Sequence, residues 1–478
     1  MNLRSTSDGW RGVIADTFTF DSLTTLTRAI ADFLEGAEAP TSTVVVGYDR
    51  RFLSKTFAEL AAAVLASSGL QVLLSDDFVP TPALTWNVKQ FKSRGGIMIS
   101  ASHNPAIYNG LKLREAYGGP PLDHTVRYIN ERAELLHRSR RGRATKDFNS
   151  LLRQGKIERI DLKNPYLKHL EQVLDLNTIA QASPKVFLDP MHGAGTGYIS
   201  TILRRCDCEV VEIHQDLNPS FDGHPPEPRR EHLTDLTELV RRTNSNRLVL
   251  GLANDGDADR LGAIDENGEY FNTNWIIALL LWHLYRQIGV RGNTVKCVGS
   301  SDLIRRIAEH HGAQCLETPV GFRYIGKAML GRNDILLGGE ESGGIGFPRH
   351  IHDKDGILAG LYLLEACARR SMGPADLLTE INNQLGSYFH GRLDLKLQRG
   401  SAQQIFERLQ RQRLETILGR QIVRTEQLDG LKYRFEDGSW LLLRPSQTEP
   451  LMRIYAESLG ENKVEELLEV GRTILRTQ

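Results

Sequence analysis

Short apolar runs rich in β-branched residues alternate with stretches of helical spacing through most of this chain. Runs of the first kind lie at 43–47, 71–75, 96–100 and 185–188, and apolar residues recur at helical spacing between 21 and 36. Such alternation is typical of βαβ units, whose strands pair into sheets covered by helices. The 478 residues exceed what one hydrophobic core holds, and a prior of about 100–200 residues per domain predicts three or four domains.

The end of the chain has a different character from the rest. Two strand-like runs flank an Asp437-Gly438 turn, and an amphipathic helix is expected from Val464 to Leu475. This segment is therefore predicted to be a small α+β domain that follows three α/β domains. The expected domains are 1–155, 156–260, 261–383 and 384–478.

Charge, cysteine content and hydropathy narrow the class of protein. Lys plus Arg and Asp plus Glu both total 59, so no general attraction to nucleic acid or to an anionic membrane is expected. The basic stretch 137–143 lacks interleaved aromatic residues and is interpreted as a solvated linker. The strongest apolar run, 275–285, is far shorter than the roughly 20 residues that span a bilayer, so we expect a buried helix. Scattered cysteines and the absence of a secretion signal favour a cytoplasmic protein with reduced thiols.

A serine follows one of the predicted strands. The segment Ser100-Ala101-Ser102-His103-Asn104-Pro105 comes directly after the run 96–100, and Lys112 lies shortly beyond it. Ligands commonly bind where the strands of an open α/β sheet end, and the amides of such a loop can hold an anion beside Ser102. A nucleophilic or phosphorylated serine fits this position, and His103 and Lys112 could exchange protons with a sugar hydroxyl. Taken alone, the motif favours an ordinary capped loop.

Three carboxylates at alternate positions form the sharpest motif, Asp255-Gly256-Asp257-Ala258-Asp259-Arg260, between two strand-like runs. Ligands that offer only oxygen suit a hard ion such as octahedral Mg²⁺ better than zinc. An EF-hand is the alternative, since the three aspartates and Glu266 occupy its positions one, three, five and twelve. However, Arg260 stands where an EF-hand needs glycine, and the flanks are strand-like instead of helical. A magnesium loop is predicted.

Two further polar loops complete the set. Glu340, Glu341 and Ser342 lie within the glycine-flanked segment 338–344, where carboxylates and a hydroxyl could bind sugar hydroxyls. The segment 444–453 holds two arginines, two hydroxyls and free amides, an inventory that suits a phosphate clamp. Taken alone, the segment 338–344 could be a solvated turn, and the segment 444–453 could be the end of a strand with surface arginines. Together, four polar loops on separate domains favour one composite site.

In sequence and order these motifs resemble those of the α-D-phosphohexomutase superfamily, the phosphoglucomutase and phosphomannomutase enzymes, over essentially the whole chain. Four more segments are similar to family signatures: 7–12, 47–51, 189–193 and 226–228. The resemblance implies an α/β protein of four domains around a central cleft. Three of these would be similar α/β domains with mixed sheets, and the fourth a smaller C-terminal α+β domain.

The resemblance also implies a role for each motif. Ser102 would carry the phosphoryl group, with His103 and Lys112 as acid and base, and with Arg11 and Arg260 beside the phosphate. Asp255, Asp257 and Asp259 would bind Mg²⁺ together with phosphorylated Ser102. Where this chain has Gln447 the family usually has Gly, which puts any positive φ there in doubt. The implied substrate contacts are Gly321, Arg323, Glu340, Ser342, Arg444, Ser446, Gln447, Thr448 and Arg453.

The implied reaction interconverts hexose 1-phosphate and hexose 6-phosphate through a 1,6-bisphosphate, in a monomer or homodimer activated by glucose 1,6-bisphosphate. Phosphoglucosamine mutases commonly carry Gln where this chain has Glu341, so we expect glucose phosphate first, then mannose phosphate or both. A hexose 1,6-bisphosphate synthase is a second enzyme hypothesis. A sugar-phosphate-binding regulator without catalysis is the third, and the intact Ser102, Lys112 and three aspartates argue against it.

Overall fold

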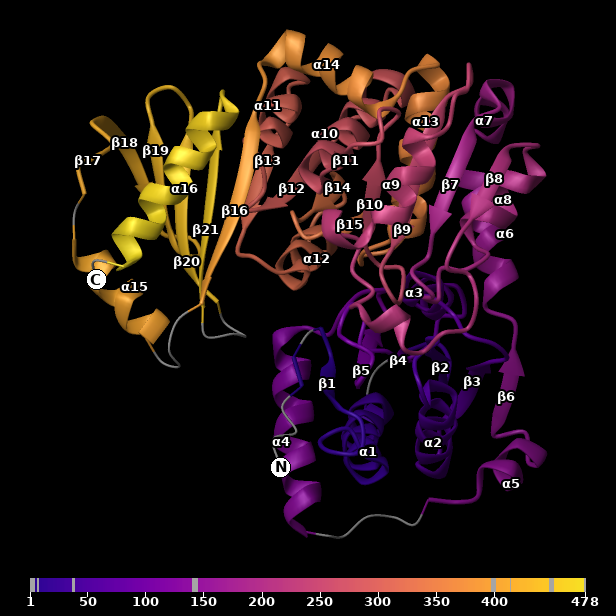
Figure 1. Ribbon diagram of the computed structural model, residues 1–478. Helices are drawn as coiled ribbons and strands as arrows, with labels where there is room; N and C mark the ends of the chain where they lie inside the picture. The colour runs from indigo at the N-terminus through magenta and orange to yellow at the C-terminus, as the bar shows by residue number, and fades with distance from the viewer. Residues whose placement is uncertain are drawn as a thin grey trace.

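The computed structural model describes residues 5–6, 8–36, 39–139, 145–396, 401–412, 414–446 and 451–476. Its strands form four sheets, each belonging to one unit of the chain. Figure 1 shows the first unit at the bottom, the second and third above it, and the fourth to the left of the third. The predicted fold is confirmed: three units combine mixed sheets with helices, and a smaller fourth unit has an antiparallel sheet.

The first unit is built on a sheet in the order β1-β5-β4-β2-β3-β6. Strand β2 is buried over nearly its whole length, as expected of a continuous apolar run in the parallel centre of a sheet. Strand β5 runs antiparallel to β4, so the serine loop joins two neighbouring strands. The elements are β1 (Trp10–Val13), α1 (Phe20–Gly36), β2 (Thr43–Tyr48), α2 (Ser54–Ser67), β3 (Gln71–Ser75), α3 (Thr81–Gln90), β4 (Gly95–Ile99), β5 (Tyr108–Glu115), α4 (Asp123–Ser139), α5 (Phe148–Arg153) and β6 (Ile157–Ile160).

The second unit has a sheet in the order β11-β10-β9-β7-β8. Strands β7, β8 and β9 are parallel, and β10 returns antiparallel to β9 with Asn254 opposite Leu261. The elements are α6 (Lys163–Val173), α7 (Leu176–Ala182), β7 (Lys185–Asp189), α8 (Ile199–Arg205), β8 (Glu209–Glu212), the 3₁₀-helices η1 (Phe221–Gly223) and η2 (Arg230–His232), α9 (Thr234–Arg241), β9 (Val249–Asn254), β10 (Leu261–Ile264) and β11 (Tyr270–Phe271).

The third unit has a sheet in the order β13-β12-β14-β15. The apolar run expected to be a buried helix is α10, which continues into the π-helix η3. No helix of the described residues is both long and apolar enough to cross a bilayer. The elements are α10 (Thr273–Trp282), η3 (His283–Ile288), β12 (Asn293–Cys297), α11 (Asp302–His310), β13 (Cys315–Thr318), α12 (Phe322–Leu330), β14 (Ile335–Gly339), β15 (Ile345–Gly346), α13 (Gly356–Arg370) and α14 (Pro374–Leu385).

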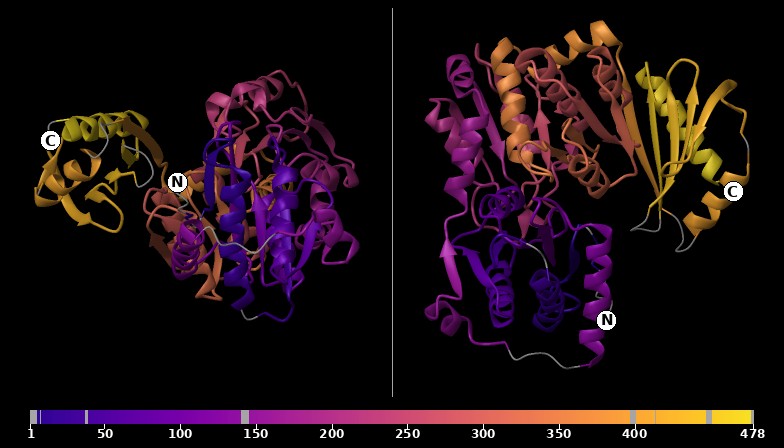
Figure 2. Two further views of the ribbon diagram at one scale, coloured as in Figure 1. Left: turned by 90° about the horizontal axis from the view of Figure 1, so that it is seen from below. Right: turned by 180° about the vertical axis from the view of Figure 1, so that it is seen from behind.

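The fourth unit has an antiparallel sheet in the order β16-β21-β20-β19-β18-β17. It keeps an apolar core of its own, whereas one continuous cluster of buried side chains links the first three units. Both views of Figure 2 show this unit beside the third and away from the first. The elements are β16 (Phe389–Lys396), α15 (Ser401–Arg411), β17 (Thr416–Ile417), β18 (Arg420–Glu426), β19 (Leu431–Phe435), β20 (Trp440–Pro445), β21 (Leu451–Ser458) and α16 (Glu461–Arg476).

Two sheets extend past the domain limits expected from the sequence. Strand β6 pairs with β3, so the first sheet continues beyond residue 155. Strands β10 and β11 belong to the second sheet, which therefore continues beyond residue 260. The second sheet passes residue 260 because the acidic loop connects two paired strands of that sheet. A domain boundary placed at the loop would separate these strands.

Candidate active site

The serine loop holds its central residue in a strained conformation. Ser102 is fully buried and has a left-handed backbone with φ of 54°, which is uncommon for a residue other than glycine. Its amide donates to Ser100 Oγ at 2.9 Å, and its own Oγ donates to Asp255 Oδ2 at 2.8 Å. His103 Nδ1 lies 3.3 Å from the same Oγ. The serine hydroxyl therefore faces the acidic loop of the second unit.

One buried arginine organises this loop from behind. Arg51 donates to the carbonyl oxygens of Ser102, Asn104, Pro105 and Tyr108. Its guanidinium also pairs with Asp49, whose carboxylate lies 3.3 Å away. In the sequence this arginine stands out only as part of the segment 47–51, which is similar to a family signature. Its role in shaping the loop depends on the fold, because the loop follows it by about fifty residues.

The three aspartates of the acidic loop are fully buried at the turn between β9 and β10. One ligand oxygen from each lies within 4.8 Å of the other two. The Oδ1 atoms of Asp257 and Asp259 are buried and accept no hydrogen bond in the structure. Burial, followed by the charges of Asp259 and Asp257, raises the pKa of Asp255 to about 7. Such convergence of acidic oxygens suits a divalent cation.

The EF-hand alternative is excluded by the position of Glu266. Its carboxylate accepts hydrogen bonds from the amides of Ala375 and Asp376 at 3.2 and 3.1 Å, so it caps the first turn of α14. The acidic loop joins strands β9 and β10, where an EF-hand has two helices.

Positive side chains surround the triad from several units. Lys112, on β5, contacts Asp257 Oδ2 and lies 3.1 Å from Asp259 Oδ2. Lys354, from the loop before α13, lies 3.2 Å from the same oxygen of Asp259. Arg260 is held by Glu227, 3.0 Å away. The sequence held no signal for Lys354, because only the packing of the third unit brings it here.

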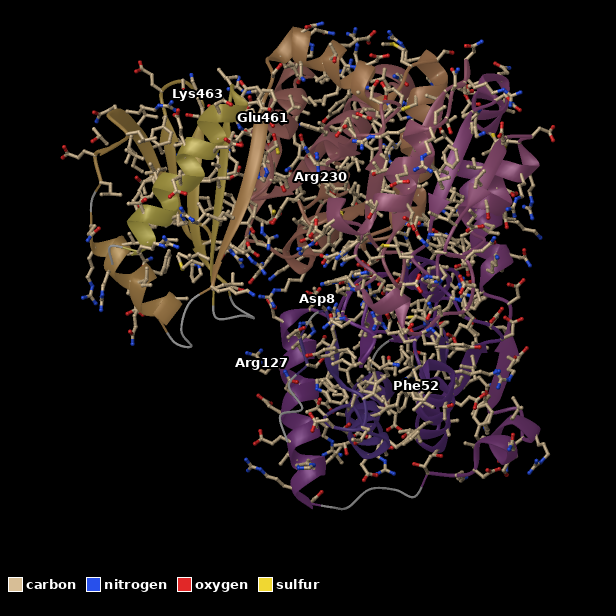
Figure 3. The ribbon with its side chains drawn as sticks, in the orientation of Figure 1. Asp8, Phe52, Arg127, Arg230, Glu461 and Lys463 are labelled. Atoms are coloured by element: carbon tan, nitrogen blue, oxygen red, sulfur yellow. The ribbon has the colours of Figure 1, made fainter. Side chains whose placement is uncertain are left out.

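Other residues close the first-unit side of the cluster. Thr81, at the start of α3, also contacts Asp257 Oδ2, and sequence analysis did not identify it. Arg11 donates to Asn104 Oδ1 at 2.6 Å, so it lies against the serine loop. Burial, followed by the charges of Arg260 and Arg11, holds the pKa of His103 well below its usual value, so its imidazole is neutral. Asp8 lies near the junction with the third unit (Figure 3).

The loop expected to bind sugar lies directly beside the acidic loop. Leu261 donates to the carbonyl oxygen of Gly343 at 3.1 Å, and Arg260 forms a bridge with Gly344. Glu340 is buried, and burial raises the pKa of its carboxyl to about 7. Ser342 is half-buried in the same loop. The structure thus brings the two loops together.

Glu341 is held by residues outside the acidic loop. Its Oε2 accepts from the thiol of Cys297 at 2.8 Å, and its Oε1 accepts from the hydroxyl of Tyr455 at 3.0 Å. Tyr455 belongs to β21 of the fourth unit. Glu341, the position where phosphoglucosamine mutases commonly carry Gln, therefore links the third and fourth units.

The remaining candidates form a second group on α12 and the fourth unit. Gly321 precedes α12 with φ of 123°, and the guanidinium of Arg323 lies over the ring of Tyr324. Arg444 is buried and pairs with Asp429 at 2.7 Å, and Asp429 also accepts from the amide of Val320. Ser446 and Arg453 lie at the ends of β20 and β21. Gln447 and Thr448 lie outside the described residues.

Comparisons with known proteins agree with this arrangement. Models of the phosphoglucomutase/phosphomannomutase alpha/beta/alpha domains I, II and III match residues 3–137, 164–268 and 272–384, and the C-terminal domain model matches 401–470. A phosphoglucomutase/phosphomannomutase from Thermococcus kodakarensis is 30% identical over 471 residues, which cover 98% of this chain and 97% of that protein. A phosphoglucosamine/phosphogalactosamine mutase from Sulfurisphaera tokodaii is 29% identical over 464 residues, or 97% of this chain and 96% of that protein.

A solved structure gives the same result in three dimensions. The crystal structure of a proposed phosphomannomutase from Thermus thermophilus has a TM-score of 0.86 and 32% sequence identity, and the match covers 100% of this chain and 99% of that one. All four domain models, in order, and relatives matched from end to end lead to one conclusion. The chain belongs to the phosphoglucomutase/phosphomannomutase family and is a phosphohexomutase, an enzyme of intramolecular phosphoryl transfer.

Proposed function

We propose that this enzyme is a phosphoglucomutase that interconverts glucose 1-phosphate and glucose 6-phosphate through phosphorylated Ser102 and glucose 1,6-bisphosphate. The observation that carries the proposal is the 2.8 Å hydrogen bond from Ser102 Oγ to Asp255 Oδ2. The serine hydroxyl lies beside three buried carboxylates that could bind a cation. A phosphoryl group on this hydroxyl would therefore have a cation next to it, as phosphoryl transfer requires.

The residues present fit Mg²⁺. All three side chains offer only oxygen, and two of their buried oxygens have no other partner. Asp255, Asp257 and Asp259, with a phosphoryl oxygen on Ser102, would hold the ion. When bound, it would neutralise charge on the phosphoryl group during transfer.

The proposed reaction has two matching halves. A sugar hydroxyl attacks the phosphorus on Ser102, the bond between phosphorus and Oγ breaks, and the bond between phosphorus and the sugar oxygen forms. The hydroxyl loses its proton to a base, and Oγ regains one. Neutral His103, 3.3 Å from Oγ, and Lys112 are the groups proposed for these proton transfers. The bisphosphate then reorients, and its other phosphoryl group returns to Ser102.

Positive side chains would stabilise the transferring group, and more distant ones would hold the substrate. Arg11 and Arg260 lie beside the serine loop and the acidic loop respectively, where they can spread the developing charge. Glu340 and Ser342 are proposed to bind the 3- and 4-hydroxyls of the sugar. The remaining phosphate and the specificity loop would use Gly321, Arg323, Arg444, Ser446, Gln447, Thr448 and Arg453.

A phosphomannomutase or a dual-specificity enzyme is the second candidate. The Thermococcus kodakarensis relative carries both activities in its name, which favours this candidate. Glucose and mannose differ at carbon 2, whereas Glu340 and Ser342 are proposed to address carbons 3 and 4. The sugar loop therefore does not separate the two epimers, and a substrate panel is needed.

The test is a Mg²⁺-dependent mutase assay with glucose 1-phosphate and mannose 1-phosphate, with and without glucose 1,6-bisphosphate. Ser102→Ala is compared with Ser150→Ala, an exchange of a serine on α5 of the first unit. We expect loss of turnover only in Ser102→Ala, because the covalent acceptor is missing. Turnover of mannose phosphate alone would indicate a phosphomannomutase, and net formation of bisphosphate when a separate phosphoryl donor is supplied would indicate a synthase. Substantial turnover by Ser102→Ala would sink the serine assignment.

A further inference from the structure

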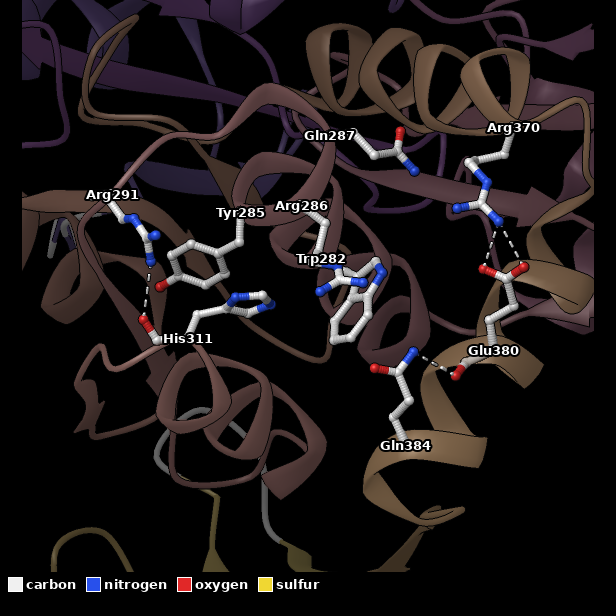
Figure 4. Close-up of a pocket in the computed structure, with 9 residues that line it drawn as sticks. All are labelled: Trp282, Tyr285, Arg286, Gln287, Arg291, His311, Arg370, Glu380 and Gln384. Carbon is white, nitrogen blue, oxygen red and sulfur yellow. Dashed lines mark hydrogen bonds and ion pairs between the residues drawn. The ribbon is translucent and has the colours of Figure 1, made fainter.

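A polar pocket opens on the third unit, away from the acidic loop. Its volume is about 430 Å³, and its walls come from α10, η3, α13 and α14 and from the segments that follow η3 and α11 (Figure 4). Helix α13 connects the two places: its first residue, Gly356, donates to the carbonyl oxygen of Ala258, and its last, Arg370, lines the pocket. The 15 residues of α13 span about 22 Å at 1.5 Å per residue. We call this second place the arginine pocket.

The lining of the arginine pocket is positively charged. It contains Arg286, Arg291 and Arg370, against a single carboxylate, that of Glu380. Arg370 and Glu380 pair with each other at 2.8 Å and neutralise one another. Within the described residues, neither Arg286 nor Arg291 has a carboxylate within ion-pair distance. Two guanidinium groups therefore remain available to an anion.

A buried nitrogen without a partner lies in the same wall. His311 Nε2 is shielded from solvent and makes no hydrogen bond in the structure. Its ring stacks on that of Tyr285, with centroids 4.8 Å apart, and its carbonyl oxygen accepts from Arg291. Burial lowers the pKa of His311, and the charges of His310 and Arg286 lower it further. The local potential is thus positive without a charged histidine.

Arg286 and Arg291 are exposed, and contacts with the walls restrain them. Arg286 lies over the ring of Trp282, with its guanidinium carbon 5.4 Å from the ring centre. Tyr285 donates to the carbonyl oxygen of Gly292 at 2.6 Å, which ties η3 to the segment that carries Arg291. A π-helix such as η3 is rare and is found frequently at functional sites. Side chains arranged before binding lose less entropy when a ligand arrives.

We propose that the arginine pocket binds a phosphate monoester with hydroxyl groups, its phosphate oxygens facing Arg286 and Arg291. Guanidinium groups match the geometry and charge of a phosphate, and about 430 Å³ lies within the usual range for small-molecule sites. Gln287 and Gln384 line the remaining wall; Oε1 of Gln287 is bonded to His283 and Nε2 of Gln384 to Glu380, so Nε2 of the first and Oε1 of the second are the atoms that can bind hydroxyls. Sugar phosphates and nucleoside monophosphates share this chemistry.

The test is isothermal titration calorimetry on the full-length enzyme with Mg²⁺, using glucose 6-phosphate, adenosine 5′-monophosphate and inorganic phosphate as separate probes. The double variant Arg286→Gln/Arg291→Gln is compared with Arg153→Gln/Arg204→Gln, two exposed arginines of other units. We expect one ester to show a site that weakens about 10-fold or more in the first variant only, because two charged hydrogen bonds are lost. Mutase turnover should stay unchanged in both variants.

The titrations identify the class of ligand or overturn the proposal. Loss of an adenosine monophosphate site would identify a nucleotide pocket, and loss of a second glucose 6-phosphate site would identify a sugar-phosphate pocket. Equal binding of all probes by native enzyme and the Arg286→Gln/Arg291→Gln variant would overturn the proposal. So would inorganic phosphate that binds the pocket as tightly as either ester, since the hydroxyl contacts would then contribute nothing. Because turnover is measured separately, failure here leaves the mutase assignment unaffected.

Discussion

Two buried clusters in this enzyme contain the same charges in different arrangements. The first, which we name the catalytic cluster after its proposed role, consists of Asp255, Asp257, Asp259, Lys112, Lys354 and Arg260. The interface cluster, between the third and fourth units, consists of Asp302, Glu317, Glu457, Lys296, Lys432 and Arg434. In the interface cluster Asp302 and Glu317 each pair with more than one cation, and Glu457 accepts hydrogen bonds from the amide of Asp302 and from Trp440 Nε1. In the catalytic cluster the three carboxylates converge, and no other such convergence occurs in the described part of the chain.

This difference in arrangement distinguishes a cluster that suits a bound cation from a cluster that supports the structure. Converging carboxylates repel one another in a medium of low polarity, which is unfavourable unless a cation joins them. Paired opposite charges satisfy each other: Lys296 lies 3.1 Å from Asp302 and 2.6 Å from Glu317. The interface cluster needs no ligand, and it joins a fourth unit whose apolar core is separate from the core of the other three. Buried charged residues alone therefore do not identify a cation-binding site, whereas carboxylates that converge on one point do.

The largest expected effect is on stability, from Asp302→Ala in the interface cluster. Asp302 is 1% exposed and pairs with Lys296, Arg305 and Arg434. Removal of its carboxylate leaves the fully buried Lys296 with Glu317 as its one ion-pair partner among the described residues, so unfolding should become easier by about 3 kcal/mol. Urea unfolding measures the change, with Glu134→Ala, at the exposed ion pair with Arg138, as the control. A loss below about 1 kcal/mol would show that the cluster does not hold the fourth unit.

The next largest effect is on turnover, from Asp257→Asn in the catalytic cluster. The exchange removes charge from the triad but keeps nearly the same shape. Mg²⁺-dependent turnover should fall by about 100-fold or more, equivalent to about 2.7 kcal/mol, because the proposed cation loses a ligand. Steady-state kinetics over a Mg²⁺ titration gives the value. Full turnover at saturating Mg²⁺ would contradict the proposed magnesium site.

A smaller effect is expected from pH at the edge of the interface cluster. His390 Nε2 donates to the carbonyl oxygen of Gly299 at 2.7 Å, and burial lowers the pKa of the imidazole to about 4. The unfolded chain takes up this proton near pH 6.5, so the stability contributed by neutral His390 is lost as pH falls from about 6.5 to about 4. Between pH 6.5 and 5 the loss should reach about 2 kcal/mol.

Urea unfolding at both pH values, with native enzyme and His390→Gln, measures this dependence. The variant has no imidazole to titrate, so its stability should fall less over the same interval. Equal losses in the two proteins would assign the acid sensitivity to other groups.

The smallest effect is expected from Lys432→Met, again in the interface cluster. Its ammonium donates to the carbonyl oxygen of Val298 and lies 4.1 Å from the ring centre of Trp440. Burial, followed by the charge of Lys296, lowers the pKa of Lys432 to about 8, so the site resists the charge. Methionine of similar length should change stability by less than about 1 kcal/mol and leave turnover unchanged.

The matching exchange in the catalytic cluster, Lys112→Met, should abolish turnover, and retained activity would remove Lys112 from the mechanism.

Much of the local structure follows from the sequence alone. The apolar runs 43–47 and 71–75 are strands β2 and β3, and the run 275–285 is a buried helix, because periodicity and β-branching act over neighbouring residues. The acidic loop was identifiable for the same reason: three aspartates at alternate positions between two strands lie close together whatever surrounds them. The order of the motifs also indicated the family.

Only the tertiary structure decided which distant groups meet. Lys354 and Thr81 reach the acidic loop through contacts between units, Arg51 reaches the serine loop through the folding of the first unit, and no local pattern marks the three. The partners of Glu341 were equally hidden, since Cys297 and Tyr455 lie far from it in the chain. The strands at 157–160 and 261–264 belong to the sheets before the expected boundaries, because strand pairing is a contact between segments. Local motifs therefore follow from neighbours in the chain, whereas the complete charge balance of a site follows from the fold.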